Sequence, residues 1–315
     1  MSSFLLRFGL GISLSWSLLA CAPATLTRSR LLMGHVPVNV SLHFPKAKQA
    51  EALAASEQAY RLAQKLENQI SEYQVDSELS CLNQNAGRRF CPLSAETLQL
   101  LRDALEFSEK TGGAFDIRFA SQSLAGKKGE IRLREKPSSG MLMHPETRLG
   151  IGAIGKGWIV DRMIEKLRIL GFPEALIDAG GDLRASGAPW SVAIQVPEAA
   201  LGTTTRLEKL QNRAWASSGL YEQGPHIIDP KTQTPVERRG SVTVEADDLM
   251  SADALATAFF VMGEEKSRAA LAHFANLKMI WTDPEGSSRV YFSHSSKASN
   301  DKSERKPHKR DPSNK

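Results

Sequence analysis

The residues best suited to chemistry lie in one stretch, 217–257. A Ser-Ser-Gly turn begins it, a His-Ile-Ile-Asp-Pro run starts at His226, and Asp253 is followed four residues later by Thr257. On a helix, that spacing places Asp253 and Thr257 on one face. Their carboxylate and hydroxyl could share one Mg²⁺, which prefers oxygen ligands and keeps positions open for phosphate oxygens. His226 could then exchange protons. Since a buried threonine and a capping aspartate also occur in many ordinary helices, the pair needs support from the rest of the chain.

Two glycine-rich turns offer that support. The first runs from Gly150 to Gly157 and includes Lys156 at the start of an expected helix. Its spacing approaches that of a P-loop, but Gly157 stands where a P-loop needs a hydroxyl. Glycines still let a ligand approach the backbone, and a helix start beside a lysine suits an anion. A tightly packed turn before a helix would explain the same glycines. The second turn, Asp-Ala-Gly-Gly-Asp at 178–182, follows an apolar strand. Together these parts fit a pyrophosphate-bearing ligand with Mg²⁺.

The N-terminus is typical of an export signal. Residues 1–20 contain Arg7, an apolar run and then Leu-Leu-Ala before Cys21. The run is short for a membrane span, and its end has the lipobox form of bacterial lipoproteins. We therefore expect a signal peptide over 1–20, lipidation at Cys21 and an anchor linker over 21–32. An ordinary secretory signal with an incidental cysteine is the alternative. In either case the body is exported to a compartment where ATP is scarce, which argues against an ATPase or GTPase.

The cysteines and the distribution of charge limit the possible cross-links and partners of the protein. If Cys21 is lipidated, Cys81 and Cys91 remain as a pair that could form a disulfide, or they are two unrelated small apolar residues. The net charge is +5, but the segment 294–315 holds seven Lys/Arg and three Asp/Glu, so four of those charges lie there. We expect this basic tail to be disordered. Because the remaining body is nearly neutral, a nucleic-acid partner is not expected.

The body over 33–293 is long enough for one domain with a substantial core. Hydrophobic periodicity and end signals predict helices over 47–73, 94–112, 156–171 and 251–262, and strands over 36–44, 176–178, 190–196, 241–246, 278–282 and 289–292. Short polar turns between neighbouring strands favour antiparallel pairing. We therefore expect an α+β fold rather than a doubly wound sheet.

A series of short segments keeps a fixed order along this body. They are Met33-Gly34, 73–83, Gly-Gly-Ala-Phe-Asp at 112–116, 154–161, 180–182, Ser-Gly-x-Tyr at 218–221, 226–230 and 252–257. Each is common alone, but their order and spacing are specific. The chain resembles the ApbE family, the FAD:protein FMN transferases, over nearly the whole body. The resemblance implies one α+β domain of largely antiparallel sheets with packed helices and an FAD cleft.

The resemblance also implies an activity and a set of site residues. The enzyme would bind FAD, split its pyrophosphate with Mg²⁺, release AMP and join FMN by a phosphoester to a Thr or Ser hydroxyl of an acceptor protein. The acceptors would be exported or membrane redox proteins with a short Thr/Ser motif. His226 would be the base, assisted by Lys156. Carried over by position, the FAD-lining residues would be Met33, Tyr73, Ala114, Phe115, Asp116, Lys156 and Ile228, and the metal would take the Ala153 carbonyl with the side chains of Asp253 and Thr257.

Two positions depart from the family pattern. Gly150 stands where the family usually has an aspartate, and Arg118 replaces a common threonine after Gly-Ala-Phe-Asp, ahead of a shortened stretch. Three functions are consistent with the sequence: a flavinyltransferase, an FAD-binding or FAD-hydrolysing relative that modifies no protein, and a noncatalytic envelope lipoprotein with the same fold. From the lipobox, we expect the protein to be lipid-anchored in the bacterial cell envelope and to face the periplasm.

Overall fold

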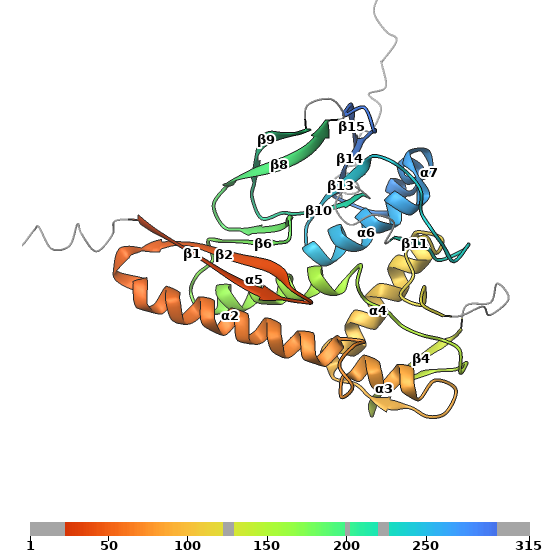
Figure 1. The fold of residues 1–315 in the computed structure, drawn as a ribbon. Helices are drawn as coiled ribbons and strands as arrows, with labels where there is room; N and C mark the ends of the chain where they lie inside the picture. The colour runs from red at the N-terminus through yellow and green to blue at the C-terminus, as the bar shows by residue number, and fades with distance from the viewer. Residues whose placement is uncertain (1–22, 122–128, 199–201, 220–226, 295–315) are drawn as a thin grey trace, which may run out of the picture.

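The centre of the molecule is an antiparallel sheet of eight strands. A computed structural model describes residues 23–121, 129–198, 202–219 and 227–294. The order across the sheet is β1-β2-β6-β7-β10-β13-β14-β15 (Figure 1), and every neighbouring pair is antiparallel. These strands are Pro23–Leu32, Val36–Pro45, Ala175–Ala179, Asp182–Ser186, Ala214–Gly219, Ser241–Ala246, Lys278–Thr282 and Ser288–Phe292. The expected α+β architecture is confirmed.

Helices cover the sheet and carry parts of the site. α2 (Gln49–Ile70) packs on β1, β2 and α5 (Gly155–Ile169), while α6 (Leu249–Met262) lies between α5 and strands β10 and β13. A helix that packs against other elements on most sides must be largely apolar, and α6 is. Asp253 is a buried acidic residue within it. The remaining helices are α3 (Glu78–Gln84), α4 (Ala95–Lys110) and α7 (Glu264–Ala270).

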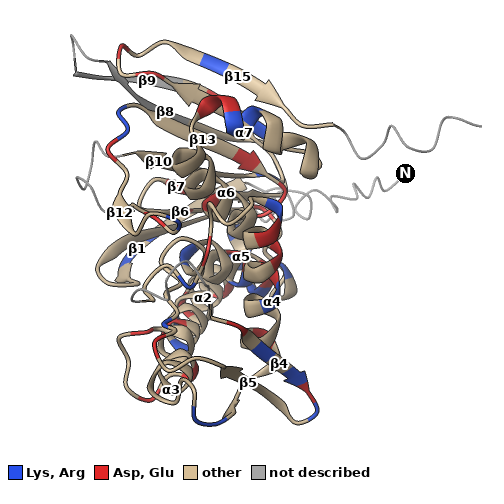
Figure 2. Cartoon of the chain, turned by 90° about the vertical axis from the view of Figure 1, so that its right-hand side faces the viewer, with Lys and Arg blue, Asp and Glu red and all other residues tan. Residues whose placement is uncertain are grey.

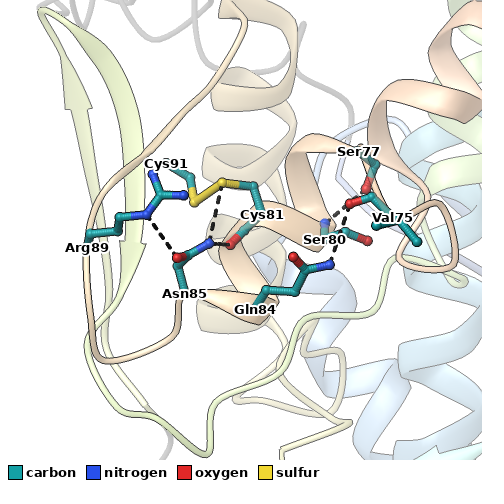
Figure 3. The surroundings of a disulfide bond; sticks show 8 residues. All are labelled: Val75, Ser77, Ser80, Cys81, Gln84, Asn85, Arg89 and Cys91. Atoms are coloured by element: carbon teal, nitrogen blue, oxygen red, sulfur yellow. Dashed lines mark hydrogen bonds between the residues drawn. A yellow bond between two sulfur atoms is a disulfide. The ribbon is translucent and has the colours of Figure 1, made fainter.

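A smaller three-stranded sheet joins α3 to the body. Its order is β3 (Cys91–Pro92), β5 (Ser138–Leu142) and β4 (Ile131–Glu135). Figure 3 shows the disulfide between Cys81 in α3 and Cys91 in β3, with Cα atoms 6.0 Å apart. Of the two possibilities that the sequence left open, the disulfide is the one observed. Two short ribbons complete the fold: β8 (Trp190–Glu198) with β9 (Gly202–Leu210), and β11 (Ile228–Asp229) with β12 (Thr234–Pro235).

Most predicted elements are confirmed, with boundary shifts of a few residues. The helix after Ser94 starts at that cap, whose side chain accepts the Thr97 N–H, and α6 ends at Gly263 as expected. The expected linker over 21–32 is wrong for Pro23–Leu32, which pairs along its whole length with β2. On this strand, Arg28 and Arg30 bind Glu57 of α2. The expected turn at 217–219 is the end of strand β10.

Basic and acidic residues are interspersed along the described elements (Figure 2), in keeping with a body of low net charge. Among the helices that the structure describes, we find none with the length and apolar character of a membrane span. The expected signal peptide, Cys21 and the tail beyond His294 lie outside the described residues.

Candidate active site

A cavity of about 510 Å³ lies where the two glycine turns, the end of β10 and α6 meet. It gathers residues that are far apart in the sequence, from the loop after α2 to the middle of α6. The lining residues are Tyr73, Ala114, Phe115, Asp116, Ile117, Phe119, Gly150, Gly152, Ala153, Lys156, Gly180, Asp182, Ser217, Ser218, Gly219, Ile227, Ile228, Pro230, Asp253 and Thr257. This volume is within the range of small-molecule and cofactor sites.

The charged centre of the cavity is Lys156 between two carboxylates. Its Nζ contacts Asp182 Oδ2 and lies 3.3 Å from Asp253 Oδ2. The backbone holds both acids: Gly157 N–H donates to Asp253 Oδ2 at 3.1 Å, and Ser217 N–H donates to Asp182 Oδ1 at 3.1 Å. Both carboxylates are 9% exposed and the lysine side chain is 22% exposed. Two carboxylates against one ammonium leave this largely desolvated cluster with one formal negative charge.

Hydroxyl groups surround the cluster on the sheet side. Thr257 lies one helical turn after Asp253 and lines the same cavity, so the predicted common face of this pair is confirmed. Its Oγ1 is 3.4 Å from Ser218 Oγ, and the neighbouring Ser217 hydroxyl is 2.8 Å from that of Thr243. Ala153, in the turn before α5, also lines the cavity. The three predicted metal ligands therefore face one space.

The opposite wall contains Ala114, Phe115 and Asp116, and Arg118 fixes the last of these. Arg118 binds both carboxylate oxygens of Asp116, with Nε 2.8 Å from Oδ1 and Nη2 3.0 Å from Oδ2. Its Nη1 donates to the Gly129 carbonyl at 3.2 Å. This bidentate geometry offsets the charge of Asp116, whose side chain is only 1% exposed. Arg118, one of the two positions at which we expect a departure from the family pattern, thus contacts the cavity wall through Asp116.

Gly150, the other of these two positions, has little room for a side chain. A Cβ atom on Gly150 would lie 2.8 Å from Phe119 Cε1 and 3.4 Å from Glu72 Oε1. The Phe119 ring, which also lines the cavity, fills the space that a side chain at position 150 would need. Burial raises the pKa of the adjacent Glu72 carboxyl. Phe119 and Gly150 therefore pack together in this wall of the cavity.

The remaining predicted residues have mixed outcomes. Tyr73 is at the rim of the cavity, with 88% of its surface exposed, and Ile228 lines the floor of the same space. Met33 does not belong to the described lining. It lies in the β1–β2 turn with φ 49°, and Val36, the first residue of β2 after that turn, packs beside Gly180. His226 lies outside the described residues, directly before the lining residue Ile227.

Eleven of the twenty lining residues were absent from the predicted set of site residues, and four of these eleven have a polar or aromatic side chain: Phe119, Asp182, Ser217 and Ser218. A signal for Asp182 existed, because it follows the Gly180-Gly181 turn, where both glycines have positive φ of 64° and 93°. Such a turn makes a tight hairpin and places Asp182 at the first position of β7. The partner of that carboxylate, 26 residues earlier, could be found only from the fold.

The structure of the chain is similar to solved structures of flavin transferases. The flavin transferase ApbE from Vibrio cholerae superposes with a TM-score of 0.75 at 26% identity, covering 88% of this chain and 99% of that one. An ApbE flavinyl transferase from Pseudomonas stutzeri, 22% identical, shares the fold with a TM-score of 0.72 over 85% of this chain and 95% of its own.

Sequence comparison agrees with the structural similarity. FAD:protein FMN transferases of Vibrio cholerae and Haemophilus influenzae are each 29% identical, over 245 and 311 residues. They cover 66% and 82% of this chain and 73% and 87% of their own. The ApbE family model matches residues 35–281. The chain belongs to the ApbE family.

Proposed function

We propose that this protein is an FAD:protein FMN transferase. It moves FMN from FAD to a Thr or Ser hydroxyl of an acceptor protein and releases AMP. The observation that carries the proposal is the Lys156, Asp182 and Asp253 cluster in a glycine-lined cavity, in a member of a family whose named relatives have this activity. The cavity joins an apolar wall, suited to a flavin ring, to a charged end suited to a pyrophosphate.

The reaction is a phosphoryl-type displacement. The acceptor hydroxyl oxygen bonds to the phosphorus of the FMN half, the bond from that phosphorus to the bridging oxygen breaks, and AMP leaves with that oxygen. The hydroxyl proton passes to a base, for which His226 is the candidate. Lys156 lies in the first turn of α5, where its ammonium would stabilise the negative charge on the phosphate oxygens. Asp182 and Asp253 orient the ammonium.

The donor set around Asp253 fits Mg²⁺. A buried carboxylate, the Thr257 hydroxyl and the Ala153 carbonyl supply hard oxygen atoms, and the ammonium of Lys156 against Asp253 shows that the site accommodates positive charge. Within the described residues there is no group of three or more His, Cys, Asp or Glu suited to a metal, so this set depends on a hydroxyl and a carbonyl. When bound, Mg²⁺ would neutralise charge on the pyrophosphate.

The location and the acceptor extend the same proposal. The lipobox ending at Cys21 supports a lipid-anchored enzyme of the bacterial cell envelope that faces the periplasm. Its acceptor is then an exported or membrane redox protein that presents a Thr/Ser motif. Anchoring through Cys21 would leave little free chain between the membrane and β1, which begins at Pro23.

One incubation tests the activity. Purified protein, FAD, Mg²⁺ and a candidate acceptor are combined, and the products are read as in-gel flavin fluorescence of the acceptor and as AMP by chromatography. The proposal expects both in equal amounts, and neither with Asp253→Ala. AMP and free FMN without labelled acceptor, across several acceptors, would indicate an FAD hydrolase. Absence of FAD binding at micromolar concentration would indicate a noncatalytic protein.

A further inference from the structure

Helices α5 and α6 touch through their backbones beside the charged cluster. A Cβ atom on Gly157 would lie 2.4 Å from the carbonyl oxygen of Leu249 and 2.8 Å from Met250 Cα, so only glycine permits this approach. The N–H of Gly157 also donates to Asp253. Any shift of α6 along α5 would therefore move Asp253 relative to Lys156, the residue before Gly157.

Asp161, about one turn further along α5, binds the start of α6. Its Oδ1 accepts the N–H of Leu249 at 3.0 Å, and its Oδ2 accepts the N–H of Met250 at 2.8 Å. The first N–H groups of a helix have no partner inside it and need caps. The N-cap residue Asp248 accepts the next one, the N–H of Ser251, at 2.7 Å. Asp161 thus completes the capping of α6 from a different helix, which fixes the two helices to each other.

The same carboxylate also holds strand β7. Arg184 Nε donates to Asp161 Oδ1 at 3.1 Å, and the two side chains are 16% and 15% exposed. Asp182 lies two residues before Arg184 on β7, and residues two apart on a strand project from the same face. A desolvated ion pair of this kind is costly to break by removing one partner.

We propose that Asp161 is a positioning residue for the transfer reaction, because its carboxylate connects the three elements that carry Lys156, Asp182 and Asp253. Each element supplies one member of the charged cluster: α5 the lysine, β7 one carboxylate and α6 the other. Asp161 lines no part of the cavity and acts through these elements. The expected effect on turnover rests on the proposed function. The connection of the three elements by Asp161 does not, because it follows from the observed contacts.

The electrostatics of Asp161 are consistent with this role. Burial, together with the nearby Asp248 carboxylate, raises its pKa to about 6 despite the two N–H donors and Arg184. At neutral pH the Asp161 carboxylate is ionised, and its ionisation lowers the unfolding free energy of the protein. Groups whose ionisation is disfavoured by their surroundings are concentrated at functional sites.

The test compares Asp161→Asn with a capping variant elsewhere. Asparagine keeps the size of the side chain but replaces one acceptor oxygen with an NH₂ donor. This donor would face another donor, either a backbone N–H of α6 or the Arg184 guanidinium, so one hydrogen bond is lost. Ser94→Ala is the matched control, because it removes the Thr97 N–H cap of α4 without touching the cluster. Asp161→Asn is expected to lower kcat at least tenfold while the Kd for FAD, measured by flavin fluorescence, changes less than threefold. Ser94→Ala should leave kcat within twofold.

A second readout does not depend on turnover. The rate at which acetic anhydride modifies Lys156, followed by peptide mass spectrometry, reports how firmly its ammonium is held against Asp182 and Asp253. This rate should rise at least threefold in Asp161→Asn and stay unchanged in Ser94→Ala. If wild-type protein labels no acceptor but the Lys156 rate still rises in Asp161→Asn, the proposed function fails and the connection holds. Unchanged Lys156 reactivity in Asp161→Asn, or a similar kcat loss in both variants, would overturn the proposal.

Discussion

Replacing the disulfide Cys81–Cys91 should cost a predictable amount of stability. The bond closes a loop between residues ten apart in the sequence. The loop-entropy relation gives about 3 kcal/mol at 25 °C for a ring of this size. For a domain of this length, that corresponds to a fall in Tm of roughly 6 to 12 °C. The double variant Cys81→Ala/Cys91→Ala avoids leaving one free thiol, and Cys91 is fully buried, so alanine suits its apolar surroundings.

The assay is guanidinium unfolding of both proteins under oxidising conditions, with reduced wild type as a third sample. The reduced wild type should match the double variant, because both lack the bond. The folded arrangement should persist, since Ser77 caps α3 and the Asn83 amide binds the N–H and C=O of Leu149 beside the cavity. FAD affinity should therefore change little at 25 °C. A loss below about 1 kcal/mol would refute the reasoning, because it would mean that the loop is already restricted in the unfolded chain.

Three further predictions follow from the cavity and its supports. Asp253→Asn should keep the fold but lower Mg²⁺-dependent turnover at least a hundredfold, which corresponds to an activation barrier higher by about 3 kcal/mol. Turnover within tenfold of wild type would exclude a metal-binding role for this carboxylate. Gly150→Asp should lower the unfolding free energy by about 1 to 3 kcal/mol, because the new Cβ atom meets the Phe119 ring. Adding Phe119→Ala to the same chain should recover part of that loss. If Gly150→Asp costs the same with and without Phe119, the ring is not the obstacle. The pKa of Asp161 is raised from 3.8 to about 6, so its contribution to stability is fully present well below pH 3.8 and is lost as the pH rises through about 6. The unfolding free energy of wild type relative to Asp161→Asn should therefore fall by about 2 kcal/mol between pH 4 and 7.5. A constant difference across denaturant titrations at these pH values would contradict this.

Local signals in the sequence were sufficient for the longer helices, for six of the strands and for nine of the twenty residues that line the cavity. The Ser94 cap, the closing Gly263 and the alternation over Ser241–Ala246 fixed elements that the structure confirms. The four-residue spacing of Asp253 and Thr257 placed both on one wall of the cavity. These signals work because capping and periodicity depend on residues close in the chain.

What the sequence did not reveal depends on distant packing. The alternating polar residues of β1 gave no sign that Arg28 and Arg30 bind Glu57 of α2. The pairing of Arg118 with Asp116 and the fit of Phe119 against Gly150 likewise require the folded arrangement of the wall. Asp161 was visible only as part of a family-like segment, and its contacts with α6 join residues about ninety positions apart.

The central claim is that this protein transfers FMN to another protein and that the cavity around Lys156 and Asp253 is the site of the reaction. Intact-mass spectrometry of an acceptor after incubation with this enzyme, FAD and Mg²⁺ tests it most directly. The account predicts an acceptor heavier by one FMN less one water, attached at a Thr or Ser side chain, with no such product from Asp253→Ala. An unmodified acceptor beside consumed FAD, or full labelling by Asp253→Ala, would contradict the account.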